Sequence, residues 1–139
     1  MIITMKIKYH LIISSVTFFA WLSFYLLGSS SNYFQEWNFS ELIILSLLTI
    51  FAIAPFISIA LMVLIPNKYI KTGIWLAFYA SFPFAVYDYI ICGIIKGEGL
   101  NIFISHWYLT LGYFYVWIIG PFTGYILNKF KQQVIKNNI

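Results

Sequence analysis

Four long apolar stretches alternate with short polar ones along the chain. The apolar stretches cover residues 11–28, 42–65, 72–95 and 102–127. A transmembrane helix needs roughly 17–25 predominantly apolar residues, and all four stretches meet that length. Short polar connections place consecutive helices beside one another in opposite directions. The pattern therefore predicts an all-α integral membrane protein, with residues 1–139 forming a single transmembrane domain, an antiparallel up-and-down four-helix bundle.

The first apolar stretch also resembles a secretory signal peptide. Lys6 and Lys8 precede it, and the small residues Gly28, Ser29 and Ser30 follow it. The apolar region of a signal peptide has about 7–15 residues, and this stretch is longer. A retained transmembrane helix is therefore the preferred interpretation, with cleavage as the alternative.

Three prolines lie within the predicted helices. Pro55, Pro83 and Pro121 each lack the backbone N–H that an α-helix needs at that position, so we expect a kink at each. A polar tail follows residue 127, and we expect it to fray beyond Gln133.

Composition strengthens the membrane interpretation. Hydrophobic residues make up 62% of the chain and charged residues 9%, and the mean hydropathy is +0.88. A soluble domain of this length cannot bury so much apolar surface, so the surplus must face lipid. The eight basic residues are all lysines, which argues against a bidentate phosphate site and against nucleic acid as a partner. The expected partners are the lipid bilayer and either further copies of the chain or other membrane proteins.

The lysines predict the orientation in the membrane. In a four-span arrangement only Lys96 falls on one side, and the other seven fall on the opposite side (Lys6, Lys8, Lys68, Lys71, Lys129, Lys131 and Lys136). The positive-inside rule then places both termini in the cytoplasm. The richness in Ile, Lys and Asn is typical of an AT-rich genome, so we expect a bacterial cytoplasmic membrane.

Small residues recur at helical spacing in the third and fourth stretches. Such residues allow two helix backbones to approach closely within a membrane. The expected packing residues are Gly73, Ala77, Ser81 and Ala85 on the third stretch and Gly120 and Gly124 on the fourth.

Asp88 is the only acidic residue inside an apolar stretch, and it lies on the same face as the small residues. A charged group at that depth costs several kcal/mol unless it is paired, so it marks a candidate functional site. His106 begins a mixed polar face on the fourth stretch, and the short connection predicts a contact between Asp88 and His106, either direct or through a water molecule. The remaining candidates for binding or proton relay are Tyr87, Cys92, Thr110 and Tyr113.

Two interpretations of this pair stay open. It is either an interhelical hydrogen bond that fixes packing, or a site that relays protons or binds a cation. We expect no catalytic residue, no metal and no cofactor, because Cys92 with Asp88 and His106 has no recognisable ligand spacing. The sequence therefore favours an accessory subunit of a membrane assembly, with no enzymatic activity. A small proton- or cation-linked transporter or channel that uses Asp88 and His106 is the second hypothesis, and a membrane-embedded enzyme acting on lipid is the third.

Overall fold

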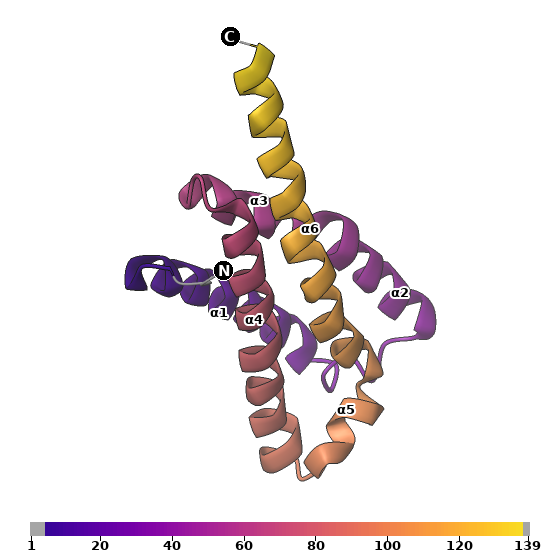
Figure 1. The fold of residues 1–139 in the computed structure, drawn as a ribbon. Helices are drawn as coiled ribbons and strands as arrows, with labels where there is room; N and C mark the ends of the chain where they lie inside the picture. Colours follow the sequence, from indigo (N-terminus) through magenta and orange to yellow (C-terminus); the bar gives the residue numbers. More distant parts are fainter. Residues whose placement is uncertain (1–4, 138–139) are drawn as a thin grey trace.

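The computed structural model describes residues 5–137, and over this range the chain forms helices without strands. Four helical segments are long and apolar enough to cross a membrane: Ile7–Ser29, Phe39–Leu64, Tyr69–Ile95 and Trp107–Asn137 (Figure 1). The all-α class is therefore confirmed, as is the presence of four helical segments long and apolar enough to span a membrane.

Two of the four spans contain π-helical turns. The first span is a single helix, α1 (Ile7–Ser29), and the second combines α2 (Phe39–Leu48), the π-helical η1 (Thr49–Ile53) and α3 (Ala54–Leu64). The third combines α4 (Tyr69–Asp88) and the π-helical η2 (Tyr89–Ile95). A 3₁₀ turn, η3 (Gly99–Asn101), and the short helix α5 (Ile102–Ser105) lead to the fourth, α6 (Trp107–Asn137).

The fourth span differs from its prediction at both ends. A continuous helix from residue 102 is wrong, because His106 leaves the helical conformation (φ −107°, ψ 51°) and separates α5 from α6. The Thr110 hydroxyl donates to the Phe103 carbonyl oxygen at 2.8 Å and thereby supplies a partner at the break. Fraying beyond Gln133 is also wrong, since α6 stays helical to Asn137.

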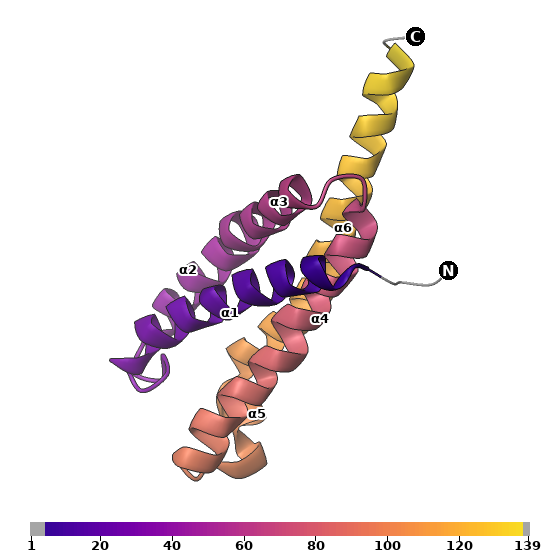
Figure 2. The ribbon, with the colours of Figure 1, turned by 90° about the vertical axis from the view of Figure 1, so that its left-hand side faces the viewer.

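The backbones of α4 and α6 approach each other closely at their glycines. A Cβ atom added to Gly73 would lie 2.2 Å from the Gly120 carbonyl oxygen, and one added to Gly124 would lie 2.6 Å from that of Tyr69. Only glycine permits backbones to come this near. The two helices lie side by side in Figures 1 and 2. The helical assignment continues through Pro83 and Pro121, so the bends expected there stay predictions.

Pro55 explains the π-helical turn η1. In this turn the Ala54 N–H donates to the Thr49 carbonyl oxygen, five residues earlier. The next bond of that pattern would join the Pro55 nitrogen to the Ile50 carbonyl, but proline carries no N–H. The Tyr115 hydroxyl of α6 donates to the Ile50 oxygen instead, at 3.0 Å. One tyrosine thus satisfies the carbonyl that the proline leaves free and ties the second span to the fourth.

The helices α1, α2 and α3 cover one side of the α4–α6 pair. Figure 2 shows α1 crossing α4 obliquely, with α2 and α3 on the same side of the pair. The main apolar core lies where α1, α3 and α4 meet, and its buried residues are Ile13, Leu61, Ile65, Leu76 and Ala80. By contrast, α2 contributes no buried residue.

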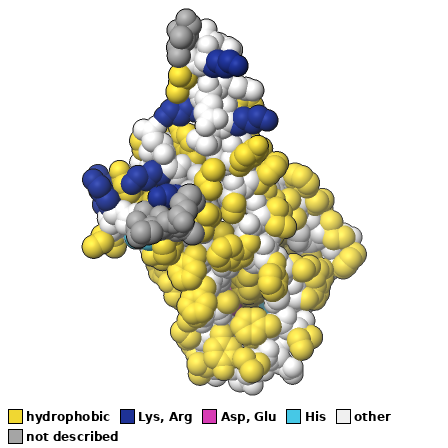
Figure 3. All heavy atoms as spheres, in the orientation of Figure 1, with side chains coloured by type: hydrophobic (Ala, Val, Ile, Leu, Met, Phe, Trp, Pro, Cys, Tyr) yellow, Lys and Arg dark blue, Asp and Glu magenta, His cyan; other side chains and the backbone are white. Residues whose placement is uncertain are grey.

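Positive charge gathers at one end of the molecule. The Lys68 Nζ lies 5.0 Å from the centre of the Tyr9 ring, and the Lys131 Nζ lies 6.0 Å from that of Tyr69. These contacts join the start of α1, the turn before α4 and the end of α6. On the face drawn in Figure 3 the lysine side chains cluster at this end, no acidic side chain is visible, and hydrophobic side chains cover most of the rest.

Candidate functional site

The Asp88 carboxylate forms the centre of a buried polar cluster. Asp88 is the last residue of α4 and is 3% exposed. Its Oδ1 accepts hydrogen bonds from the Trp21 Nε1–H at 2.8 Å and the Tyr33 hydroxyl at 2.6 Å, and its Oδ2 accepts one from the Tyr113 hydroxyl. These donors come from α1, the α1–α2 connection and α6. Three hydrogen bonds from within the chain offset the cost of burying the carboxylate.

Aromatic rings enclose one side of this cluster. The Trp21 ring stacks on Tyr25, with centroids 5.4 Å apart, and lies 4.9 Å from the Tyr87 ring. Tyr87, a sequence candidate, therefore packs against a hydrogen-bond donor of Asp88 through its ring. The arrangement shields the carboxylate with apolar surface.

Tyr33 reaches Asp88 through an unusual backbone. Asn32, Tyr33 and Phe34 have φ values of 49°, 61° and 68°, a left-handed run without glycine. Such residues cost about 1–3 kcal/mol each and persist only where their surroundings hold them. Here the Lys96 Nζ donates to the Asn32 Oδ1 at 2.8 Å, and the Tyr108 hydroxyl donates to the Tyr33 carbonyl oxygen.

Close packing around this connection surrounds Phe34 and keeps the Tyr33 hydroxyl protonated. The Phe34 ring occupies the space where a Cβ atom on Gly28 would sit. Burial and, after it, the nearby Asp88 carboxylate raise the pKa of the Tyr33 hydroxyl far above its ordinary value. Tyr33 therefore remains a protonated donor at physiological pH.

His106 is buried, but it makes no direct hydrogen bond with Asp88. Its Nδ1 lies 2.9 Å from the Ser105 Oγ, whose hydroxyl donates to the Glu98 Oε2 at 2.9 Å. When the Ser105 hydroxyl donates to Glu98, its oxygen can accept from Nδ1–H, and in this tautomer of the neutral imidazole Nε2 keeps a lone pair. Nε2 is buried and has no hydrogen-bond partner among residues 5–137.

Tyr33 contacts both of the residues that the sequence paired. The Tyr33 hydroxyl bonds to Asp88, while its ring centre lies 5.9 Å from that of His106. The expected direct contact between Asp88 and His106 is therefore absent. His106 lies just before the fourth span, and burial lowers the pKa of its imidazole against the opposing influence of Glu98.

The other sequence candidates lie in separate places. Thr110 bonds to the Phe103 backbone at the helix break, and Cys92 is fully buried in a cluster with Tyr33 and Ile102. A search of residues 5–137 finds no group of three His, Cys, Asp or Glu side chains that could hold a metal ion. Among the packing candidates, the Ser81 Oγ accepts a hydrogen bond from the Trp117 Nε1–H at 3.0 Å.

Sequence reasoning missed two of the three donors to Asp88. The buried residues of α1 are Ile13, Thr17, Trp21 and Gly28, whose spacing of four, four and seven marks one helical face. The spacing of these residues indicates that Trp21 lies on the buried face of α1. Tyr33 gave no such signal, because its position depends on a left-handed backbone that no periodicity reveals.

Comparison of the chain with protein-family models, with curated proteins and with solved structures finds no match. The function must therefore be inferred from the geometry of the chain itself.

Proposed function

We propose that this chain is an accessory subunit of a membrane assembly, which acts by binding other membrane proteins. The main support for the proposal is that the Asp88 carboxylate accepts hydrogen bonds from three donors in three separate segments. A carboxylate held in this way joins α1, the α1–α2 connection and α6 to α4. Asp88 thus supports the assembled shape of the subunit.

The interior offers little for a transport pathway. A cavity of about 80 Å³ lies between α1, the second span, α4 and α6. The hydroxyls on its wall belong to Thr17, Thr49 and Ser58, and each donates to a backbone carbonyl of its own helix. Ions and protons need polar groups that can exchange partners. These hydroxyls are already committed, which favours the accessory function over the transporter.

The second span supplies a surface for a partner. Only 6% of the most apolar 18-residue segment of this span is buried, whereas the corresponding segments of the first, third and fourth spans are 17%, 22% and 17% buried. Leu47 and Phe51 point outward, with 48% and 76% of their surface exposed. A helix with so little packing inside the chain is well placed to pack against another membrane protein.

In-cell photo-crosslinking tests this function. A photo-crosslinking amino acid in place of Leu47 or Phe51 should give an adduct of one defined mass that contains a second membrane protein. The same group in place of Leu26, an exposed residue of α1, serves as the matched control and should give no such adduct.

Flux measurements on proteoliposomes distinguish the transporter. Proton or cation flux through the purified chain, abolished by Asp88→Asn without loss of thermal stability, would favour the transporter and reject the accessory function. Destabilisation by Asp88→Asn with no flux in either protein agrees with the structural role of the carboxylate.

A further inference from the structure

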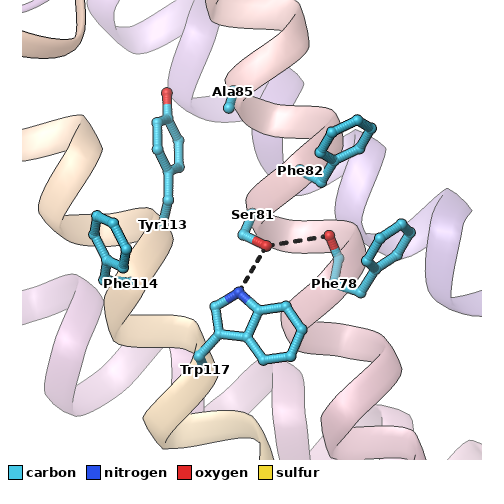
Figure 4. A pocket seen from close by; sticks show the side chains of 7 residues that line it. All are labelled: Phe78, Ser81, Phe82, Ala85, Tyr113, Phe114 and Trp117. Carbon is cyan, nitrogen blue, oxygen red and sulfur yellow. Dashed lines mark hydrogen bonds between the residues drawn. The ribbon is translucent and has the colours of Figure 1, made fainter.

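A shallow apolar groove runs along the lipid-facing seam between α4 and α6 (Figure 4). Its volume is about 340 Å³, and it is lined by Phe78, Ser81, Phe82, Ala85, Tyr113, Phe114 and Trp117. The glycine contacts hold the two helices together near Gly73 and Gly120, and the groove opens beyond them. Phe82 and Phe114 form opposite rims and are 63% and 69% exposed.

The polar atoms in this groove need no ligand. The Ser81 hydroxyl donates to the Phe78 carbonyl oxygen at 3.3 Å and accepts from the Trp117 indole N–H. Figure 4 shows these bonds across the floor of the groove. The Tyr113 hydroxyl is directed away, to Asp88. The groove therefore fits a saturated hydrocarbon chain better than a ligand with carbonyl or hydroxyl groups, whose hydrogen bonds would find no partner.

The lysine-rich end lies at the correct distance for a lipid headgroup. Lys71 precedes Phe78 by seven residues and Ala85 by fourteen, so it shares their side of α4. At 1.5 Å per residue, the groove extends from about 10 Å to about 21 Å below Lys71. One leaflet of the hydrocarbon core is about 15 Å thick, so the part of the groove nearer Phe78 overlaps the distal half of an acyl chain, and the part near Ala85 extends past the leaflet.

Lys131 contributes from the other helix. It follows Trp117 by fourteen residues and lies over the Tyr69 ring at the start of α4. Asp88, the only acidic residue of α4 and α6, lies at the far end of α4 from these lysines. The positive charge at this end therefore complements an anionic phosphate.

We propose that the α4–α6 groove binds one anionic phospholipid, with an acyl chain against Phe82, Phe114 and Trp117 and its phosphate near Lys71 and Lys131. The lipid covers the seam where the helices diverge. This site is independent of the partner surface on the second span.

Photo-crosslinking with defined lipids tests the site. The purified full-length chain is reconstituted in nanodiscs with phosphatidylglycerol or phosphatidylcholine that carries a diazirine near the end of one acyl chain. We expect phosphatidylglycerol to label the groove peptides more strongly, by about fivefold for each lysine that contacts the phosphate. Equal labelling by both lipids would overturn the proposal.

Two sets of variants locate the lipid. Ala85→Trp should fill the groove and abolish the preference, whereas Ile90→Trp, at a lipid-exposed position outside it, should retain the preference. Lys71→Gln with Lys131→Gln should reduce phosphatidylglycerol labelling to the phosphatidylcholine level, and Lys136→Gln should leave it unchanged. If Ala85→Trp does not fold, the lysine variants alone decide. Disulfide-linked dimers of Phe114→Cys in membranes would instead assign the groove to a second copy and overturn the lipid site.

Discussion

Three uncharged side chains donate hydrogen bonds to the Asp88 carboxylate. Removing the hydroxyl of either tyrosine tests what its hydrogen bond contributes to stability. Tyr33→Phe and Tyr113→Phe each leave part of the buried carboxylate without its hydrogen bond, so each should lower the free energy of unfolding by about 1–3 kcal/mol. Reversible unfolding in mixed detergent micelles measures the loss. Tyr25→Phe is the control, because Tyr25 is close to the cluster and stacks on Trp21 but donates no hydrogen bond to Asp88. Equal losses in all three variants would show that the effect is not due to the carboxylate.

His106 makes stability depend on pH in one direction. Burial lowers the pKa of His106 in the folded chain, so the unfolded chain binds a proton first as the pH falls. Stability from this group is therefore complete above the ordinary histidine pKa of about 6.5 and decreases below it. Thermal unfolding from pH 8 to pH 5 should show this decrease, and His106→Gln should reduce it. His10→Gln, which removes the other histidine, should leave most of the decrease in place.

At this scale the sequence predicted the centre of the site better than its surroundings. Asp88 was identifiable because a carboxylate in an apolar stretch is costly, and Tyr113 because its spacing placed it on the facing helix. The expected direct contact with His106 is absent, and its prediction assumed one continuous helix from residue 102. The break at His106 directs its ring to Ser105, and the left-handed connection brings Tyr33 into contact with both residues.

At the scale of helices, two glycines that both lie within helices should respond oppositely to substitution by alanine. Gly73→Ala places a Cβ atom 2.2 Å from the Gly120 carbonyl oxygen, so α4 and α6 must separate. We expect a loss of about 1–3 kcal/mol in unfolding free energy. A Cβ atom on Gly112 meets nothing within 4 Å, so Gly112→Ala should be neutral or stabilise α6 by up to about 1 kcal/mol. Matched losses in the two variants would contradict the close packing.

The bond between Tyr115 and Ile50 can be separated from ordinary packing by a double-mutant cycle. Tyr115→Phe leaves the Ile50 carbonyl without a donor and should cost about 1 kcal/mol. Pro55→Ala restores a backbone N–H that can bond within the second span, so Tyr115→Phe should cost much less in that background. The cycle uses the same micellar unfolding measurement. A Tyr115→Phe cost that is unchanged by Pro55→Ala would show that the hydroxyl does not replace the missing N–H.

Helix existence was predictable from apolar length, but several helix boundaries were not. The polar tail was expected to fray beyond Gln133, yet it continues the long α6 to Asn137 without a break. The π-helical turn before Pro55 was also invisible to a pattern of period 3.6, although the proline that explains it was recognised as a disruption. Whether a backbone carbonyl such as that of Ile50 finds a hydrogen-bond donor depends on residues such as Tyr115 that lie far away in the sequence, and hydropathy does not reveal them.

At the scale of the whole molecule, charge separates the two ends. Lys68 and Lys131 mark the end where α1 begins and α6 finishes, and Glu36 lies on the connection at the other end of α1. The positive-inside rule predicts that the lysine end is cytoplasmic. Labelling of cysteines placed at the two ends therefore tests the orientation of the entire chain.

Cysteines placed at the two ends should respond differently to a membrane-impermeant maleimide. Glu36 and Lys136 are both exposed, so Glu36→Cys should be labelled on intact cells and Lys136→Cys only after permeabilisation. The native Cys92 is fully buried and provides an unlabelled background in both variants. The reversed result would reject the orientation, and labelling of both variants on intact cells would indicate a mixed population. Because the lysines that orient the chain also form one end of the proposed lipid site, a cytoplasmic result would place the bound lipid in the inner leaflet.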